Sequence, residues 1–97
     1  MKAIFVAYNQ AYGEEIVAVL DRFGQRGFTR WNDIAGRGGV DGEPHMGSHA
    51  WPVMNCAILT MVPDEMAQPL LDALRATDEA SPDLGLRAYC WGVEAAV

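Results

Sequence analysis

The sequence predicts an α+β fold in which two helices cover one face of an antiparallel sheet. Three observations lead to this prediction. Four segments have the β-branched and aromatic composition of strands and two have helical period, in the order strand, helix, strand, strand, helix, strand. The chain has 97 residues, which suits one domain, residues 1–97. Apolar residues make up 51% of the chain and charged residues 21%, as in folded proteins.

The first half of the chain predicts a strand, a helix and a second strand. Residues 2–8 are β-branched and aromatic and end at a polar pair, which predicts a strand. Residues 11–23 have an apolar stripe at helical spacing, formed by Ile16, Val19, Leu20 and Phe23. Gly24 is a suitable stop for this helix. Residues 28–35 alternate in character and predict a strand with mixed, partly exposed faces.

The second half repeats the pattern in the order strand, helix, strand. Residues 53–62 are almost wholly apolar, which predicts a strand buried on both faces. A helix is expected from Pro63 to about Ala76, with Pro69 bending its opening turn or forcing a later start. Residues 77–84 read as a polar loop and 85–93 as a last strand. This order predicts the ferredoxin-like βαββαβ arrangement, with a long loop between strands 2 and 3.

The predicted strands are apolar on both sides, although two helices can cover only one face of the sheet. The first strand has Ile4, Val6 and Tyr8 on one side and Ala3, Phe5 and Ala7 on the other. Residues 94–97 are too few to cover the second face, and soluble proteins rarely leave so large an apolar surface in water. We therefore expect an oligomer. Trp91 is expected at the subunit interface, whereas the role of Trp51 stays open between interface and ligand stacking.

Charge and cysteine content exclude several classes of function. Thirteen acidic residues against seven basic ones give a net charge of −6, which argues against nucleic-acid binding and against attraction to anionic membranes. No apolar run is long enough to span a bilayer, so we expect no membrane insertion. The two cysteines suggest no disulfide scaffold, so we expect a protein of the reducing cytoplasm. Cys56 and Cys90 lack CxxC spacing and are expected to be buried small apolar residues rather than a disulfide.

The loop of residues 36–51 contains both histidines and five of the ten glycines. A connection of this length between antiparallel strands is usually functional or disordered. No helix follows its Gly-Arg-Gly-Gly segment, which excludes a dinucleotide fingerprint and a P-loop. The segment can still present backbone N–H groups and the guanidinium of Arg37 to an anion.

Three residues of the same loop form an alternative site. His45, Met46 and His49 have donor atoms that suit copper or zinc, as in a metal-responsive trimer similar to CutA-type proteins. Their spacing in a glycine-rich loop does not fix them on one side, so we expect solvent-exposed histidines and favour no metal site. Asp33 or Asp41 could pair with a histidine for acid–base chemistry, but nothing places them together. We therefore expect a protein that is not an enzyme.

Short motifs stand at the ends of several of these segments. The helix leads into Gly24-Gln25-Arg26-Gly27-Phe28-Thr29, and Gly36-Arg37-Gly38 then opens the long loop. Pro63-Asp64-Glu65 starts the second helix, and Gly85-Leu86-Arg87 opens the last strand. Together these motifs resemble those of PII-type nitrogen-regulatory signalling proteins, in which the last motif corresponds to a phosphate-binding loop. The resemblance covers nearly the whole chain and identifies it as a divergent PII-like member.

The resemblance implies a homotrimer that binds an adenine nucleotide or similar small effector in clefts between subunits. It also implies an effector loop that docks on a regulated protein, either an enzyme or a membrane transporter. Carried over to this sequence, the effector-binding residues are Thr29, Gly36, Arg37, Gly38, Gly85 and Arg87. The loop has no tyrosine for uridylylation, and glycine stands where the family has the glutamine that helps to hold magnesium and 2-oxoglutarate. We therefore expect a small effector other than the ATP and 2-oxoglutarate pair.

Overall fold

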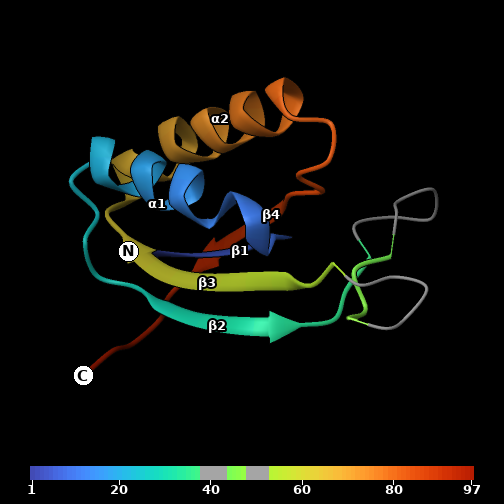
Figure 1. The fold of residues 1–97 in the computed structure, drawn as a ribbon. Coiled ribbons are helices and arrows are strands. Elements are labelled where there is room, and N and C mark those ends of the chain that lie inside the picture. The colour runs from blue at the N-terminus through green and yellow to red at the C-terminus, as the bar shows by residue number, and fades with distance from the viewer. Residues whose placement is uncertain (38–43, 48–52) are drawn as a thin grey trace.

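The computed structural model describes residues 1–37, 44–47 and 53–97 (Figure 1). The first half contains strand β1 (Lys2–Asn9), a 3-10 turn η1 (Gln10–Tyr12), helix α1 (Gly13–Arg22) and strand β2 (Thr29–Ile34). The second half contains strand β3 (Asn55–Val62), helix α2 (Asp64–Ala80) and strand β4 (Arg87–Gly92). The predicted order of strands and helices is confirmed.

The four strands form one antiparallel sheet in the order β2-β3-β1-β4. The central strands β1 and β3 pair along their whole length, from Lys2 opposite Val62 to Asn9 opposite Asn55. Both helices lie on the same face of the sheet (Figure 1). The ferredoxin-like α+β fold predicted from the sequence is therefore confirmed.

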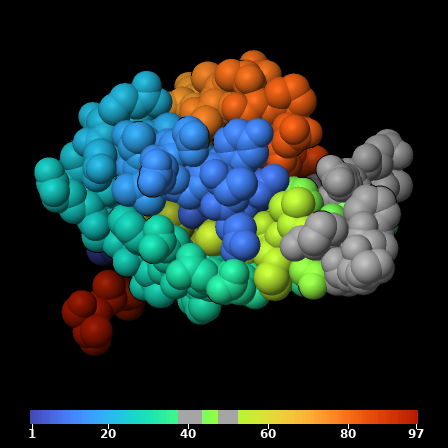
Figure 2. All heavy atoms as spheres, in the orientation of Figure 1, coloured from blue at the N-terminus to red at the C-terminus, as the bar shows by residue number. Residues whose placement is uncertain are grey.

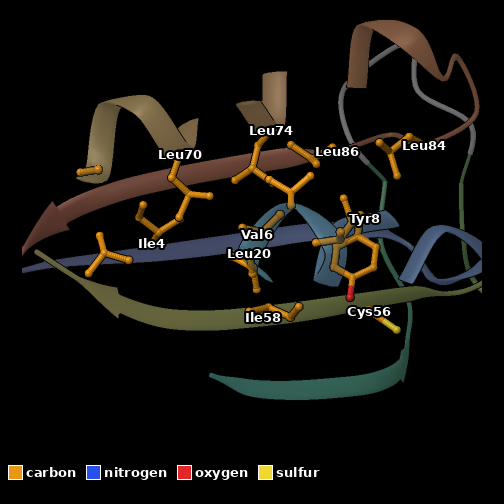
Figure 3. Close-up of a cluster of buried hydrophobic side chains, with 14 residues drawn as sticks. Ile4, Val6, Tyr8, Leu20, Cys56, Ile58, Leu70, Leu74, Leu84 and Leu86 are labelled. Carbon is orange, nitrogen blue, oxygen red and sulfur yellow. The ribbon is translucent and has the colours of Figure 1, made fainter. Parts of the chain in front are cut away.

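The hydrophobic core lies between the sheet and the two helices. Alternate residues of β1 and β3 point into it, as Figure 3 shows for Ile4, Val6 and Ile58. The helices contribute an apolar stripe at helical spacing, in which Leu20 and Leu70 are fully buried. The fully buried core side chains outside this group include Tyr8, Ile16, Leu74 and Leu84.

Side-chain hydrogen bonds of Gln25 and Thr60 hold the turn between α1 and β2 against the sheet. Gln25 Nε2 donates to Thr60 Oγ1 at 2.7 Å and to the Met61 carbonyl at 2.9 Å. Gly24 has a φ of +69°, a left-handed conformation that favours glycine, and it follows the end of the helix as predicted.

Helix α2 is longer than the sequence predicts and begins without delay. It starts at Asp64, one residue after Pro63, and continues through Pro69 to Ala80. Residues 77–80, which we expected in a loop, are therefore helical. The expectation that Pro69 could delay the start of the helix was also wrong. The last turn has a tertiary partner, because Asp78 Oδ1 accepts a hydrogen bond from Leu86 N at 3.1 Å. That contact offsets the poor helix propensity of the polar end.

The face of the sheet opposite the helices is apolar and uncovered in the single chain. We call it the open face, and its larger side chains are Phe5, Trp31, Leu59, Met61, Tyr89 and Trp91. Four of these side chains are between 43% and 58% exposed. Residues 94–97 are also exposed and extend away from the body of the protein, at the lower left of Figure 2. The chain therefore does not hide this face with its own last residues.

The two cysteines differ in environment. Cys56 on β3 is buried, as expected, but Cys90 on the edge strand β4 is exposed, so the expectation for Cys90 was wrong. An edge strand has only one neighbour, which leaves this side chain uncovered. Both thiols are free, and β1 separates their strands.

Among the described residues, no helix is both long and apolar enough to cross a membrane.

Candidate functional site

Two buried asparagines organise the end of the sheet from which the long loop leaves. Asn9 ends β1, Asn55 begins β3, and the two are direct partners in the antiparallel register. They are only 6% and 5% exposed, so their amides need hydrogen-bond partners within the protein. Each finds a partner in, or next to, a segment that the sequence analysis assigns to effector binding.

Asn9 holds the segment before β4. Its backbone N–H donates to the Leu84 carbonyl at 2.8 Å, and its side-chain Nδ2 donates to the Asp83 carbonyl at 3.1 Å. Its Oδ1 accepts from Ala11 N at 3.0 Å, which also fixes the start of the 3-10 turn. The bonds to Asp83 and Leu84 position residues 83–87, which contain the predicted Gly85 and Arg87, against the end of β1.

Asn55 holds the base of the long loop through His45. The His45 Nδ1 and Asn55 Oδ1 atoms are 2.6 Å apart, and the histidine is only 5% exposed. The backbone of His45 also pairs with Gly36 in both directions, at 2.8 and 2.7 Å. The expectation that both loop histidines are solvent-exposed was therefore wrong for His45, because an amide partner makes its burial favourable.

Two of the predicted glycines sit where a side chain would not fit without adjustment. A Cβ atom on Gly36 would lie 2.5 Å from Asn55 Nδ2, so a side chain at this position would require the Asn55 amide to move. Gly85 has a φ of +59°, and a Cβ atom there would lie 3.4 Å from His45 Cε1. Gly36 and Gly85 thus allow the two predicted effector-binding segments to meet around the same histidine.

The two predicted arginines are free to bind an anion. Arg37 and Arg87 are both exposed, and neither forms a salt bridge with any residue in the described ranges 1–37, 44–47 and 53–97. Arg87 Nη1 donates to the carbonyl of the preceding Leu86 at 2.7 Å, which leaves further guanidinium donors unused. Guanidinium groups of this kind suit phosphate and carboxylate ligands.

The remaining predicted site residues do not join this group in the single chain. Thr29 begins β2 and Arg87 begins β4, the two edge strands of the sheet. Three strand spacings separate these edges, about 14 Å. Gly38 and His49 lie outside the described residues. The single chain therefore does not place Thr29 beside Arg87.

A cleft of about 610 Å³ lies near this end of the sheet and was missed by sequence reasoning. It is lined by the 3-10 turn and by the ends of β2 and β3, including Asn32, Asp33 and Cys56. Asp33 has a φ of +57°, which is rare for a residue other than glycine and coincides with an irregularity in the pairing of β2 with β3. The Cys56 thiol donates to Asn32 Oδ1 at 3.3 Å. A single sequence gives no signal for a bulge of this kind.

Beside Cys56, the buried Tyr8 hydroxyl has no hydrogen-bond partner among the described residues. Figure 3 shows this hydroxyl directed from β1 across toward β3. Burial, reinforced by the neighbouring Cys56, raises the pKa of Tyr8 to about 12. Tyr8 is therefore a neutral hydrogen-bond donor at any physiological pH.

The described part of the chain contains no cluster of three or more His, Cys, Asp or Glu side chains that could hold a metal ion. Within the alternative metal set, Met46 is 41% exposed, whereas His45 is buried and its Nδ1 is already paired with Asn55. His45 and Met46, the two residues of the alternative metal set that the structure describes, thus do not form a metal site.

Comparison with known proteins relates this fold to solved structures. CPII from Thiomonas intermedia K12, a nitrogen regulatory PII-like protein bound to ADP, AMP and bicarbonate, is similar with a TM-score of 0.72 and 24% identity, over 97% of this chain and 88% of that chain. This chain has the PII-like fold. The PII-like signalling protein TTHA0516 from Thermus thermophilus is similar with a TM-score of 0.64 and 24% identity, over 95% and 85% of the two chains.

A third structural neighbour has a lower sequence identity. The DUF3240 family protein from Shewanella baltica OS155 has a TM-score of 0.66 and 18% identity, over 99% of this chain and 93% of that chain. No protein-family model and no curated protein matches the sequence. The fold is therefore conserved across proteins whose sequences have diverged widely.

Proposed function

We propose that the chain is a divergent PII-like regulatory protein. It binds an adenine nucleotide or a similar small anion between subunits of a cytoplasmic homotrimer. Through the loop of residues 36–51 it then regulates a partner protein, either an enzyme or a membrane transporter. It acts by binding and catalyses no reaction.

One observation carries this proposal. The Gly36–Arg37 segment and the 83–87 segment are far apart in the sequence, yet two buried asparagines and one histidine fix them at the same end of the sheet. Both segments bring an exposed guanidinium that forms no salt bridge with any described residue, and such a group suits the phosphates of a nucleotide. That CPII from Thiomonas intermedia has been solved with ADP, AMP and bicarbonate supports the same class of ligand here.

The open face supports a shared site. It exposes Trp31, Met61, Tyr89 and Trp91, an apolar surface that soluble proteins usually bury against another chain. Thr29 and Arg87 stand on opposite edges of this sheet, so subunits packed through their open faces would bring one chain's Thr29 toward another chain's Arg87. This arrangement would place a nucleotide between two copies.

Regulation would follow from a shift of populations. A ligand held between the two arginine-bearing segments favours the arrangement of the loop base that binds it best. The loop that leaves this base would then present a different surface to the partner. Of that loop, the structure describes residues 36–37 and 44–47, which form its base.

The proposal is tested by calorimetry against ATP, ADP, AMP, cyclic AMP, bicarbonate, zinc and copper. We expect heat from an adenine nucleotide, and Arg87→Ala should weaken this binding about tenfold or more, since it removes a charge-assisted contact. Arg22→Ala is the matched control, because Arg22 is an exposed arginine in the last turn of α1. Light scattering should give the same mass for all three proteins.

Two results would contradict the proposal. Silence toward every nucleotide, with heat from zinc or copper, would favour the metal-responsive alternative. Equal nucleotide affinity in the wild type and in Arg87→Ala would show that the anion binds elsewhere.

A further inference from the structure

His45 is buried, although it belongs to the glycine-rich loop between β2 and β3 and to no helix or strand. It is as inaccessible as Asn55, each being 5% exposed. A carbonyl oxygen only accepts hydrogen bonds, so the 2.6 Å pairing with Asn55 Oδ1 puts a proton on His45 Nδ1. Removal of either partner would leave a buried polar group unsatisfied.

The same residue contacts three parts of the candidate site. Its backbone forms two hydrogen bonds with Gly36, next to Arg37. Its Nδ1 binds Asn55 at the start of β3. Its Cε1 faces Gly85, two residues before Arg87. His45 therefore lies between the segments that carry the exposed Arg37 and Arg87 guanidinium groups.

The fit around His45 is tightest at Gly36. A methyl group on Gly36 would collide with the Asn55 amide that pairs with the His45 ring, whereas one on Gly85 would lie in ordinary van der Waals contact with the imidazole, 3.4 Å from Cε1. The backbone pairing with Gly36 and the bond to Asn55 thus hold His45 against the Arg37 segment, and Gly85 brings the Arg87 segment beside its ring.

We propose that His45 is a positioning residue of the effector site, which sets the spacing between the Arg37 and Arg87 segments without touching the ligand. This inference rests on the proposed function, because it assigns the ligand to those two segments. Loss of His45 should therefore lower the stability of the fold and, in addition, weaken the binding of a phosphate-bearing ligand. The second effect should depend on the presence of Arg87.

Calorimetry with ADP on the full chain tests the assignment. We expect His45→Ala and Asn55→Leu each to weaken ADP binding about tenfold. Each substitution leaves a buried polar group without its partner, and the Arg37 and Arg87 segments then lose the contact that sets their spacing. Asn55→Asp keeps an acceptor for Nδ1 and should therefore weaken ADP binding less than Asn55→Leu does. Gln68→Ala is the matched control, since it removes an exposed side-chain hydrogen bond of 2.9 Å on α2.

A double-mutant cycle separates positioning from stability. If His45 acts through Arg87, His45→Ala should reduce ADP affinity much less in the Arg87→Ala background than in the wild type. Urea unfolding of the same four proteins records the stability change separately. Equal losses of affinity in both backgrounds would overturn the assignment.

Trypsin provides a second readout that needs no ligand. Arg37 is the only Lys or Arg between residues 31 and 74, so cleavage there gives a distinct pair of fragments. We expect His45→Ala and Asn55→Leu to be cut at Arg37 several times faster than the wild type, Asn55→Asp and Gln68→Ala. Equal rates in all five proteins would show that His45 does not hold this segment.

The two proposals fail in different ways. A wild type that binds no nucleotide contradicts the proposed function and removes the ligand that His45 would serve. A wild type that binds ADP, with His45→Ala binding it equally well, overturns the His45 assignment alone. Should His45→Ala not fold, Asn55→Leu against Asn55→Asp makes the same comparison.

Discussion

The two faces of the sheet are built from the same strands but have different surroundings. On the helix side, Ile4, Val6 and Ile58 are fully buried beneath α1 and α2. On the open face, the neighbouring positions of the same strands expose Met61, Tyr89 and Trp91. Both faces are apolar, so side-chain chemistry does not distinguish them. The difference is that the chain supplies a cover for only one face.

This comparison separates what one chain can stabilise from what needs a second chain. The covered face accounts for the core of the single subunit. The open face contributes to stability only when another molecule buries it, and its contribution must therefore depend on protein concentration. Each of the following variants tests one side of that distinction.

The largest effect is expected from a charge on the open face. Trp91 is 48% exposed on the edge strand β4, and Trp91→Asp would place a carboxylate in an apolar interface without a partner. We expect light scattering to fall from three times 10.6 kDa to 10.6 kDa, with the far-UV circular dichroism unchanged. Gln68→Asp, on the exposed side of α2, should keep the wild-type mass. A wild type that is already a single subunit at micromolar concentration would remove the basis for a shared site.

The next effect compares two residues of strand β3. Ile58→Ala removes a fully buried side chain from the covered face and should lower the free energy of unfolding by about 2–5 kcal/mol at every protein concentration. Met61 is 43% exposed on the open face, so Met61→Ala should lower stability only where the oligomer forms. Urea unfolding at several protein concentrations measures both. A concentration-independent loss in Met61→Ala would contradict the distinction between the faces.

A smaller effect is expected from Tyr8 at alkaline pH. The phenol has a pKa of about 12 in the folded chain against 10.0 in the unfolded chain, so between these values only the unfolded chain has lost its proton. Unfolding then releases a proton, and the free energy of unfolding falls as the pH rises from 10 to 12. Between pH 10 and 12, the free energy of unfolding of Tyr8→Phe should fall less than that of the wild type. The difference between the two falls should reach at most about 2–3 kcal/mol.

The smallest effect concerns the same hydroxyl at neutral pH. Because the Tyr8 hydroxyl has no partner among the described residues, Tyr8→Phe should change stability at pH 7 by less than about 1 kcal/mol. Thermal unfolding measures this change. A fall of several kcal/mol in the free energy of unfolding would mean that the hydroxyl has a strong hydrogen-bond partner in the folded protein. Water would then reach further into the helix side of the sheet than the burial of Tyr8 indicates.

Periodicity was enough to predict the fold and its two faces. The alternation of residues 2–8 and 53–62 fixes which side chains share a face, since the strand period is two. The stripe of Ile16, Val19 and Leu20 fixes the buried side of α1. The length of α2 was underestimated because its last turn is held by a contact with Leu86, eight residues further along the chain, and not by local propensity.

The arrangement of the site was less accessible to sequence reasoning. Gly36, Arg37, Gly85 and Arg87 were predicted from a resemblance, but the side chains that bring them together were not. His45 has no periodic pattern around it, and its partner lies ten residues away. The available signal was a polar residue at the end of each apolar central strand, Asn9 and Asn55. A buried amide at such a position has to bind a neighbouring segment.

The open face also provides the protein with an optical probe. Trp31 and Trp91, two of the three tryptophans, are about half exposed on this surface. Indole emission shifts to longer wavelength when the ring passes from an apolar environment into water. In the proposed trimer these rings are buried, so dilution of the native protein should produce a red shift as subunits separate. Assembly could then be followed by intrinsic fluorescence without a label.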